Sequence, residues 1–169
     1  MSVVDGSGRR TGTLVGSLGS TWRGLVGPTG TVSAPDGTDP LDWWVAAEDR
    51  WHDPRREASV RQTRIGGTPV VETRLRVPGG DVIQRVYAVA DHGGMTVIDI
   101  ENDSPASTAV VFSHGRLLTP RPPADVPIEG IEVPSGSVSF PVGHHSHLTV
   151  AISHRGEVGS TKLSVPSTT

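Results

Sequence analysis

The sequence predicts an all-β protein, an antiparallel β-sandwich of about nine or ten short strands with at most one short helix. The first observation is the abundance of helix breakers, with 21 Gly and 14 Pro among 169 residues. The second is that apolar and polar residues alternate with a period of two in many segments. The third is that turn-forming residues recur every roughly eight to twelve residues, as in sandwiches.

The chain divides into three predicted parts. Residues 1–20 are rich in Gly, Ser and Thr, which predicts a flexible N-terminal arm, with a short edge strand at 13–18 as the alternative. Residues 21–154 carry the strand signals and form the predicted sandwich domain. The polar residues 155–169 predict a flexible C-terminal tail.

The single helical signal follows an early pair of strands. Two short strands within 22–32 are joined by the turn Gly27-Pro28-Thr29-Gly30. Asp39 is a suitable N-cap and Pro40 suits a first helical position. Helical spacing then predicts one or two turns before Asp53-Pro54 ends them. The residues at that spacing are Leu41, Trp44, Val45 and Glu48.

Alternation predicts antiparallel strands from about residue 58 onward. Strands at 70–77 and 82–90 form a predicted hairpin, and a third follows at 95–101. After a strand at 108–113, the proline-rich segment 117–127 predicts an extended crossing without ladder bonding. A last hairpin is predicted from two further alternating strands. They are Val138–Val142 and Leu148–Ile152.

Composition excludes several classes of protein. The net charge of −3 gives no general attraction to nucleic acids or anionic lipids, and no apolar stretch is long enough to span a membrane. Without cysteine, disulfides and thiolate metal sites are impossible. The start of the chain has no signal-peptide pattern, so a cytoplasmic location is expected. Lys162 is the only lysine beside many arginines, a bias typical of GC-rich, for example actinobacterial, genomes.

A tryptophan cluster is the first candidate binding site. Trp43, Trp44 and Trp51 lie within nine residues, together with Asp49 and Arg50. Exposed indoles stack on sugar rings, and the charged neighbours would hold the hydroxyls. The alternative is structural, because large aromatic side chains dominate protein cores and the indoles would then close one end of the sandwich.

A histidine cluster and an arginine run are weaker candidates. His144, His145 and His147 at a predicted hairpin tip are potential Zn or Ni ligands, although a solvated turn explains them equally simply. Several arginines on neighbouring strands suggest a phosphate or carboxylate platform, whereas pairing with nearby acids predicts an ordinary wet face. These arginines are Arg61, Arg64, Arg74, Arg76 and Arg85.

Recognised catalytic signatures are missing from the sequence. It contains no Gly-x-Ser-x-Gly elbow, phosphate loop, dinucleotide fingerprint or His-Glu-x-x-His motif. No pair of carboxylates is singled out as an acid and a base. We therefore expect a protein that is not an enzyme and that uses no cofactor.

The runs Leu25–Val32 (LVGPTGTV) and Leu41–Trp44 (LDWW) resemble the opening LVG-x-x-G-(S/T)-x-DW pattern of glucoamylase-type glycoside hydrolases. The segments 69–74 and 84–86 are similar to strands of the N-terminal β-sandwich in that family. The likeness covers residues 22–113, and the insertion at 33–40 departs from the pattern. The resemblance implies an accessory sandwich without the catalytic α/α barrel, and hence no hydrolase activity.

Three functional hypotheses follow. The first is a non-catalytic module, related to accessory domains of carbohydrate-active enzymes, that binds an oligosaccharide or packs on a partner. The alternative is a structural or assembly protein that binds another protein, or a second copy of itself, through a sheet edge or its Arg-rich face. The third is a small metal-dependent enzyme that uses the histidine cluster.

Overall fold

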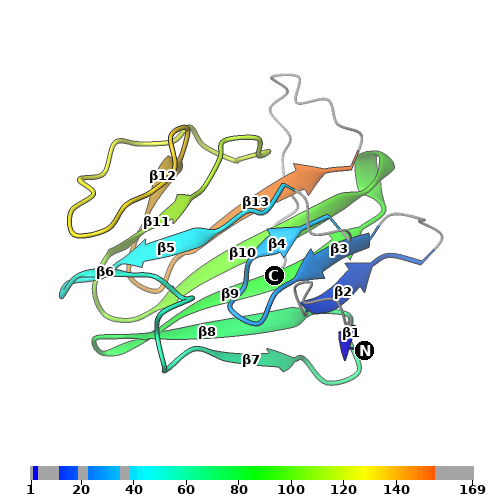
Figure 1. Cartoon of the computed structure of the whole chain (residues 1–169), viewed down its shortest axis with the longest axis horizontal. Helices are drawn as coiled ribbons and strands as arrows, with labels where there is room; N and C mark the ends of the chain where they lie inside the picture. Colours follow the sequence, from blue (N-terminus) through cyan, green and yellow to red (C-terminus); the bar gives the residue numbers. More distant parts are fainter. Residues whose placement is uncertain (1, 4–11, 19–22, 35–38, 155–169) are drawn as a thin grey trace.

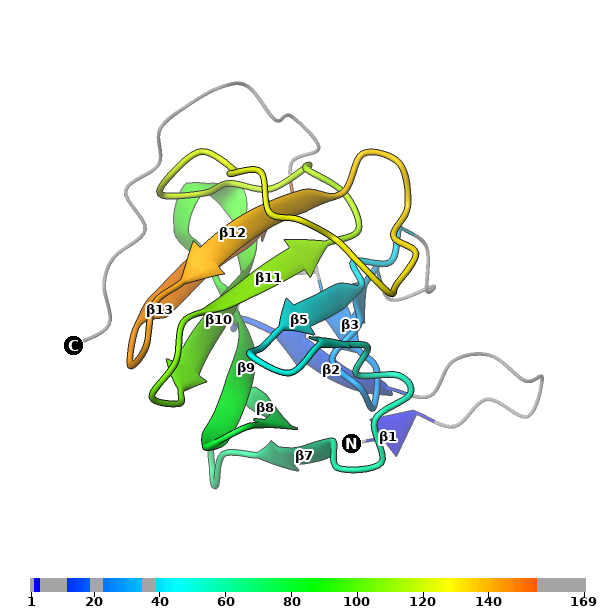
Figure 2. The ribbon, with the colours of Figure 1, turned by 90° about the vertical axis from the view of Figure 1, so that its left-hand side faces the viewer.

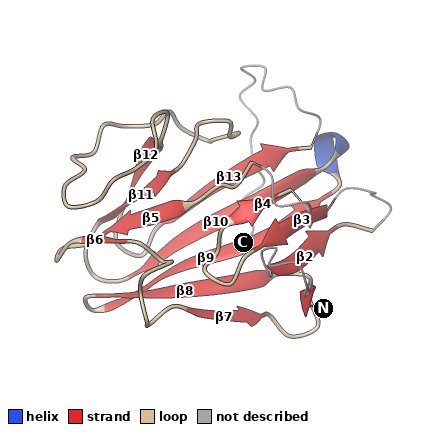
Figure 3. Ribbon diagram, in the orientation of Figure 1, coloured by secondary structure: helices blue, strands red, loops and turns tan. Residues whose placement is uncertain are grey.

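The computed structural model describes residues 2–3, 12–18, 23–34 and 39–154. Within these residues it is all-β, with antiparallel strands in three sheets and one 3₁₀ turn, η1 (Asp91–Gly93) (Figure 3). This confirms the predicted fold class, with more strands than expected. No helix in the described residues is long and apolar enough to cross a membrane.

The sheets are named A, B and C. Sheet A has the order β1 (Ser2–Val3), β2 (Gly12–Gly16), β3 (Arg23–Val26), β4 (Val32–Ser33). Sheet B has the order β12 (Val138–Val142), β11 (Thr108–Phe112), β5 (Trp43–Ala46), β6 (Trp51–His52). Sheet C has the order β13 (His147–Ser153), β10 (Met95–Asp103), β9 (Gly80–Val89), β8 (Val71–Val77), β7 (Arg61–Arg64).

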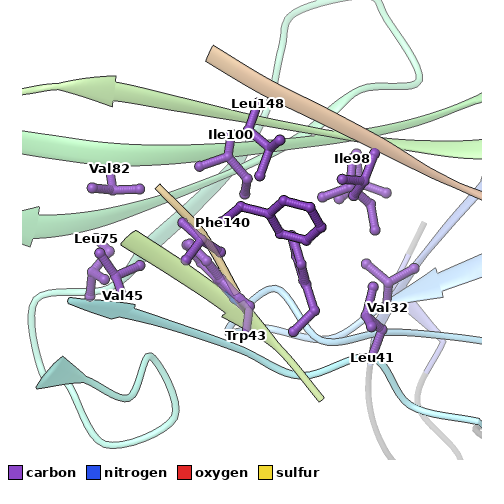
Figure 4. Packing of buried hydrophobic residues seen from close by; sticks show 14 of the residues in the cluster. Val32, Leu41, Trp43, Val45, Leu75, Val82, Ile98, Ile100, Phe140 and Leu148 are labelled. Atoms are coloured by element: carbon purple, nitrogen blue, oxygen red, sulfur yellow. The ribbon is translucent and has the colours of Figure 1, made fainter. Parts of the chain in front are cut away.

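Sheets A and B together cover one face of sheet C (Figures 1 and 2). An isolated bridge between Val32 and Leu41 links sheet A to the residues that lead into β5. The main hydrophobic core lies between these layers and includes Val32 of sheet A, Phe140 of sheet B and Ile98 of sheet C (Figure 4). Burial of this continuous apolar layer is the main stabilising contribution to the sandwich.

Alternation along sheet C places one residue set inward and the next outward, as predicted. β8 and β9 form the expected hairpin, in which Val77 pairs with Gly80, and β10 pairs with both β9 and β13. The inward residues are buried and mostly apolar, whereas the outward positions carry many charged side chains. The buried inward set includes Val71, Thr73, Leu75, Val82, Gln84, Val86, Ile98, Ile100, Leu148 and Val150.

The predicted short helix near residues 40–52 is wrong, because this segment forms β5 and β6. Trp43 and Val45 point into the main core, while Trp44 points to the opposite face of sheet B, where other residues cover it. Both faces of β5 are therefore buried, which produces an apolar run without polar alternation. Such a run has no period of its own, and the helical spacing within it was coincidental.

The predicted last hairpin is also corrected. Its two strands exist as β12 and β13, but β12 pairs with β11 in sheet B and β13 pairs with β10 in sheet C. The turn at 143–146 therefore crosses from one layer of the sandwich to the other. Phe140 and Leu148 face the same core from opposite layers (Figure 4).

The turn at 27–30 is docked inside the sandwich. Gln84 Nε2 donates a hydrogen bond to the Gly30 carbonyl (3.0 Å), and the indole of Trp43 donates to the Thr29 carbonyl (3.0 Å). Gly30 has φ 89°, and a Cβ there would lie 2.5 Å from the Gln84 side chain. The position therefore requires glycine for both its conformation and its close packing.

The boundaries of the sandwich differ from the predicted ones. β2 lies within the predicted N-terminal arm and overlaps the short strand expected at 13–18, and it pairs with β3 and buries Val15 in the core. Sheet A therefore begins before residue 21. The predicted C-terminal tail, residues 155–169, lies outside the described residues.

Candidate functional site

A proline-rich strap, residues 117–134, covers the outer face of sheet B (Figure 2). Leu118 exchanges two backbone hydrogen bonds with Ala151 of β13 (2.9 and 3.0 Å), and the Ala124 N–H donates to the Ser139 carbonyl (2.9 Å). Beneath the strap lies a small apolar cluster separate from the main core. It comprises Trp44, Trp51, Ala109 and Val111, against which Ala46, Val126, Ile131 and Val133 pack.

A cleft of ≈ 820 Å³ opens between the strap and the turn that follows β6. We call it the strap cleft. Its floor is partly apolar and its walls carry acidic and basic side chains from both segments. The lining residues are Trp44, Arg50, Trp51, Asp53, Arg55, Arg56, Glu57, Glu129, Gly130, Ile131 and Glu132.

Of the five residues predicted to bind a ligand, Trp44, Arg50 and Trp51 line the strap cleft. Asp49 lies beside it through its contacts with neighbouring side chains. Trp43 lies on the other face of β5, in the main core, and is not a lining residue. The structure thus brings four of the five residues to one place and separates the fifth.

The indoles are buried to a degree that limits sugar stacking. Trp43 and Trp44 are each 2% exposed and Trp51 is 8% exposed. The Trp51 Nε1–H donates to the Pro127 carbonyl of the strap (3.3 Å), and the Arg55 guanidinium lies 5.3 Å from the centre of the Trp44 ring. Their packing role is therefore established by the geometry, and the accessible lining of the cleft is a mixture of polar and apolar groups.

Buried His52 fixes one wall of the strap cleft. Its Nε2 lies 2.9 Å from Asp49 Oδ1 and its Nδ1 lies 3.1 Å from Glu57 Oε1. Arg50 donates two hydrogen bonds to the same Glu57 carboxylate (2.6 and 3.3 Å), and this contact lowers the pKa of Glu57. Each ring nitrogen of His52 therefore contacts one carboxylate, which fixes the orientation of the ring.

Arg55 organises the second part of the same wall. Its guanidinium donates to Asp53 at 3.0 and 2.9 Å and to Asp42 at 3.4 Å. Burial acts to raise the pKa of Asp53, but the hydrogen bonds from Arg55 outweigh burial and lower that pKa. Asp53 is therefore a charged, fixed acceptor at the cleft.

The remaining charges on the rim are accessible. Arg56 has an 87% exposed side chain, and its one ion pair within the described residues is a 3.9 Å contact with Asp53. Glu129 and Glu132 of the strap are exposed and line the opposite wall. The cleft therefore offers both donors and acceptors to a ligand.

The three histidines predicted to bind metal do not converge on one point. His145 lies 3.7 Å from Asp103 and His147 lies 3.4 Å from Asp99, whereas the rings of His144 and His145 meet edge to face. Across the described residues, no group of three or more His, Cys, Asp or Glu side chains is arranged to hold a metal ion. The geometry gives the metal hypothesis no support.

The Arg-rich face on the outer side of sheet C consists largely of ion pairs. Arg74 and Arg85 both donate to Glu72 (2.6 and 2.9 Å), and Arg85 also donates to Glu101 (2.6 Å). Arg61, Arg74 and Arg76 all lie within 4.0 Å of Asp81. This arrangement corresponds to the alternative of an ordinary solvent-exposed face, because carboxylates of the same sheet neutralise most of the positive charge.

Several cleft residues were missed by sequence reasoning. The charged run 50–57 gave a usable local signal, since alternating acids and bases beside aromatic residues indicate a polar wall. Glu129 and Glu132 gave no such signal, because the strap reaches the cleft only through non-local packing. Comparisons with protein-family models, curated proteins and solved structures find no match to this chain.

Proposed function

We propose that this chain is a non-catalytic β-sandwich module that binds a glycan in the strap cleft. The observation that carries the proposal is that Trp44, Arg50 and Trp51, chosen from the sequence as ligand residues, all line one cleft. Its volume of ≈ 820 Å³ lies within the usual range for small-molecule sites, roughly 300–1,000 Å³.

The chemistry of the walls supports a polyhydroxylated ligand. Arg50 and Arg55 are held by carboxylates, so their remaining N–H groups are preorganised donors. Glu129 and Glu132 supply acceptors on the facing strap. A glycan hydroxyl both donates and accepts, so it fits mixed walls of this kind, while the half-buried side chain of Ile131 contributes apolar contact.

The resemblance of residues 22–113 to the accessory sandwich of glucoamylase-type enzymes supports the non-catalytic part of this proposal. The residues that carry it also contact one another. Thr31 donates to Asp42 (2.7 Å), and Trp43 donates to Thr29 (3.0 Å). The two halves of the motif thus form one structural unit despite the insertion between them, which is consistent with a role in folding.

Affinity electrophoresis through gels that contain soluble α-glucans tests the proposal. We expect retarded migration of the wild type, and loss of that retardation in an Arg56→Ala/Glu132→Ala variant. Arg61→Ala is the matched control, since this arginine is 60% exposed on sheet C and makes one long ion pair of 3.7 Å. Unretarded wild type would exclude α-glucans, and equal retardation of both variants would exclude this cleft.

A second candidate function is protein assembly through the edge of sheet C. Within the described residues, β7 pairs only with β8. Because the Ile65 N–H bonds to the Val70 carbonyl, alternation turns the backbone groups of Gln62 and Arg64 away from β8. Such an edge accepts an added strand.

Sedimentation velocity over a concentration series tests self-association by this edge. We expect a wild-type dimer that Arg64→Pro abolishes, because proline removes the outward N–H but is tolerated on an edge strand. A monomer at every concentration, or a dimer unaffected by the substitution, would exclude self-association through β7.

A further inference from the structure

A second groove lies on the outer face of sheet C, on the opposite side of the sandwich from the strap cleft. We call it the sheet C groove, and its volume is ≈ 580 Å³. Its residues come from the β7–β8 turn and from three neighbouring strands, β9, β10 and β13. They are Ile65, Val70, Arg85, Tyr87, Asp99, His147 and Thr149.

The floor of the sheet C groove is apolar and contains the only tyrosine of the chain, Tyr87. Tyr87 is half-buried and packs against a small cluster formed by Met95, Val97, Leu118 and Ala151. Ile65 at the margin is 36% exposed. This packing holds the Tyr87 side chain in place before a ligand binds. The entropy cost of ordering the ring on binding is therefore small, as a stacking surface requires.

The polar wall is held in place by hydrogen bonds within the sheet. Thr149 Oγ1 donates to Asp99 Oδ1 (2.9 Å), and His147 Nδ1 lies 3.4 Å from Asp99 Oδ2. Contact of Nδ1 with the carboxylate leaves Nε2 of His147 directed away from it. Arg85 is fixed by Glu72 and Glu101 and lies 3.8 Å from Asp99.

The charges of this wall are balanced locally. The lining residues Arg85 and Asp99 carry opposite charges, and among the described residues of the whole face four arginines stand against four carboxylates. These are Arg61, Arg74, Arg76 and Arg85 against Glu72, Asp81, Asp99 and Glu101. A strongly anionic ligand would meet these carboxylates, and a cationic one would displace Arg85 from them. The ligand whose charge matches a balanced wall above an aromatic floor is uncharged and rich in hydroxyl groups.

We propose that the sheet C groove is a second carbohydrate site, which binds a neutral sugar unit with its apolar face on Tyr87. Arg85 donates to its hydroxyls and His147 Nε2 exchanges a hydrogen bond with them. The inference rests on the proposed function only for the class of ligand. Its consequence is bivalence, because sites on opposite faces of one sandwich engage two glycan chains at once.

NMR titration with soluble neutral oligosaccharides of the malto, cello and xylo series tests this inference, with indole fluorescence as a parallel readout. Among the described residues, two tryptophans line the strap cleft and none lines the sheet C groove, so a change in indole fluorescence points to the first site. We expect one of these sugars to shift the amide resonances of Tyr87, Asp99 and Thr149, and to do so also in Arg56→Ala/Glu132→Ala.

Two variants make the assignment specific. Tyr87→Ala should weaken binding at the groove about tenfold, in line with the value of an aromatic contact. His147→Ala alters an exposed side chain with one long contact within the described residues, and it should weaken binding while leaving the unfolding transition unchanged. Arg76→Ala, on the same face but outside the groove, is the matched control and should bind as the wild type does.

The outcomes separate the two sites. Shifts confined to the strap cleft would overturn the inference and leave the proposed function standing. Shifts confined to the groove would support the inference and overturn the strap cleft as the glycan site. No shift with any series would overturn both. Shifts of the groove resonances on simple dilution, without sugar, would assign this surface to a second copy of the chain and overturn the inference.

Discussion

The two outer faces of the sandwich are covered in different ways. On sheet B the outward side chains include Trp44 and Val111, and the strap shields them from water. On sheet C the outward side chains are largely charged, and they neutralise one another across the strands, as Glu72 does with Arg74 and Arg85. The outer face of sheet B is thus covered by the strap, whereas the outer face of sheet C is exposed to water and its charges form ion pairs.

This difference explains where the two clefts form. The strap cleft opens beside residues 129–132 of the strap, where they face the turn that follows β6. The sheet C groove lies where the ion-pair ladder gives way to the apolar patch around Tyr87. A ligand site on this fold is therefore expected at the margin of the strap or of the ion pairs on sheet C, and not at the centre of either.

The largest predicted effect is on the strap side. Trp44→Ala removes a side chain that is 2% exposed and leaves a cavity beneath the strap, so the free energy of unfolding should fall by about 3–5 kcal/mol. Urea denaturation followed by far-UV circular dichroism measures this change. A loss below about 1 kcal/mol would mean that the strap collapses onto the site.

The corresponding change on sheet C should be smaller. Glu72→Gln removes the negative charge shared by Arg74 and Arg85 while keeping the side-chain shape, and we expect a loss of about 1–3 kcal/mol. The same denaturation experiment applies, with Glu101→Gln as the more exposed control. If Glu72→Gln costs more than Trp44→Ala, the ion pairs rather than the strap dominate the stability of the outer faces.

Acid should act on the sheet C layer through His154. Burial lowers the pKa of this histidine, whose Nε2 lies 3.0 Å from Thr96 Oγ1, to about 4 from a usual value of 6.5. The unfolded chain therefore binds more protons below pH 6.5, so this contribution to stability is full above 6.5 and is lost as the pH falls toward 4. Thermal melts of wild type and His154→Gln at pH 7.5 and 5.0 should show a smaller pH dependence in the variant. An equal dependence in both proteins would assign the effect to other groups, such as His114, whose pKa burial also lowers.

The smallest predicted effect is at the exposed end of the ion-pair ladder. Arg76→Ala removes a 59% exposed side chain that lies 3.2 Å from Asp81, and stability should change by less than about 0.5 kcal/mol. Comparison with Glu72→Gln then shows whether the ion pairs of sheet C stabilise the fold mainly through Glu72 at their centre. A loss above 1 kcal/mol, again from urea denaturation, would indicate a cooperative network instead.

The sequence predicted the local features of this fold and missed the non-local ones. Period-two alternation correctly identified the inward residues of β8 and β12, because apolar residues lie on the core side of each strand and mostly polar residues on the other. It failed at β5, since the strap buries the outer face as well and removes the polar half of the pattern. Two consecutive strands such as β12 and β13 can hydrogen-bond in one sheet or lie in two sheets that pack face to face. The pattern of residues within each strand is the same in both cases.

In the candidate site, too, the residues close in sequence were predicted and the distant ones were missed. Trp44, Arg50 and Trp51 were found because they are neighbours in sequence and lie on one hairpin. Trp43 was included with them, although strand geometry sends adjacent side chains to opposite faces. The strap residues and the sheet C groove come together from distant segments, so they were visible only in the folded chain.

The crossing at residues 143–146 has a consequence for synthesis of the protein. β13 is the last described strand, yet it pairs with β10 and supplies Leu148 and Val150 to the core. A nascent chain therefore holds an open β10 edge and an unfilled core until β13 has left the ribosome. During that interval the edge is a template for intermolecular pairing. A chain that ends before residue 147 should therefore aggregate more readily than the full chain.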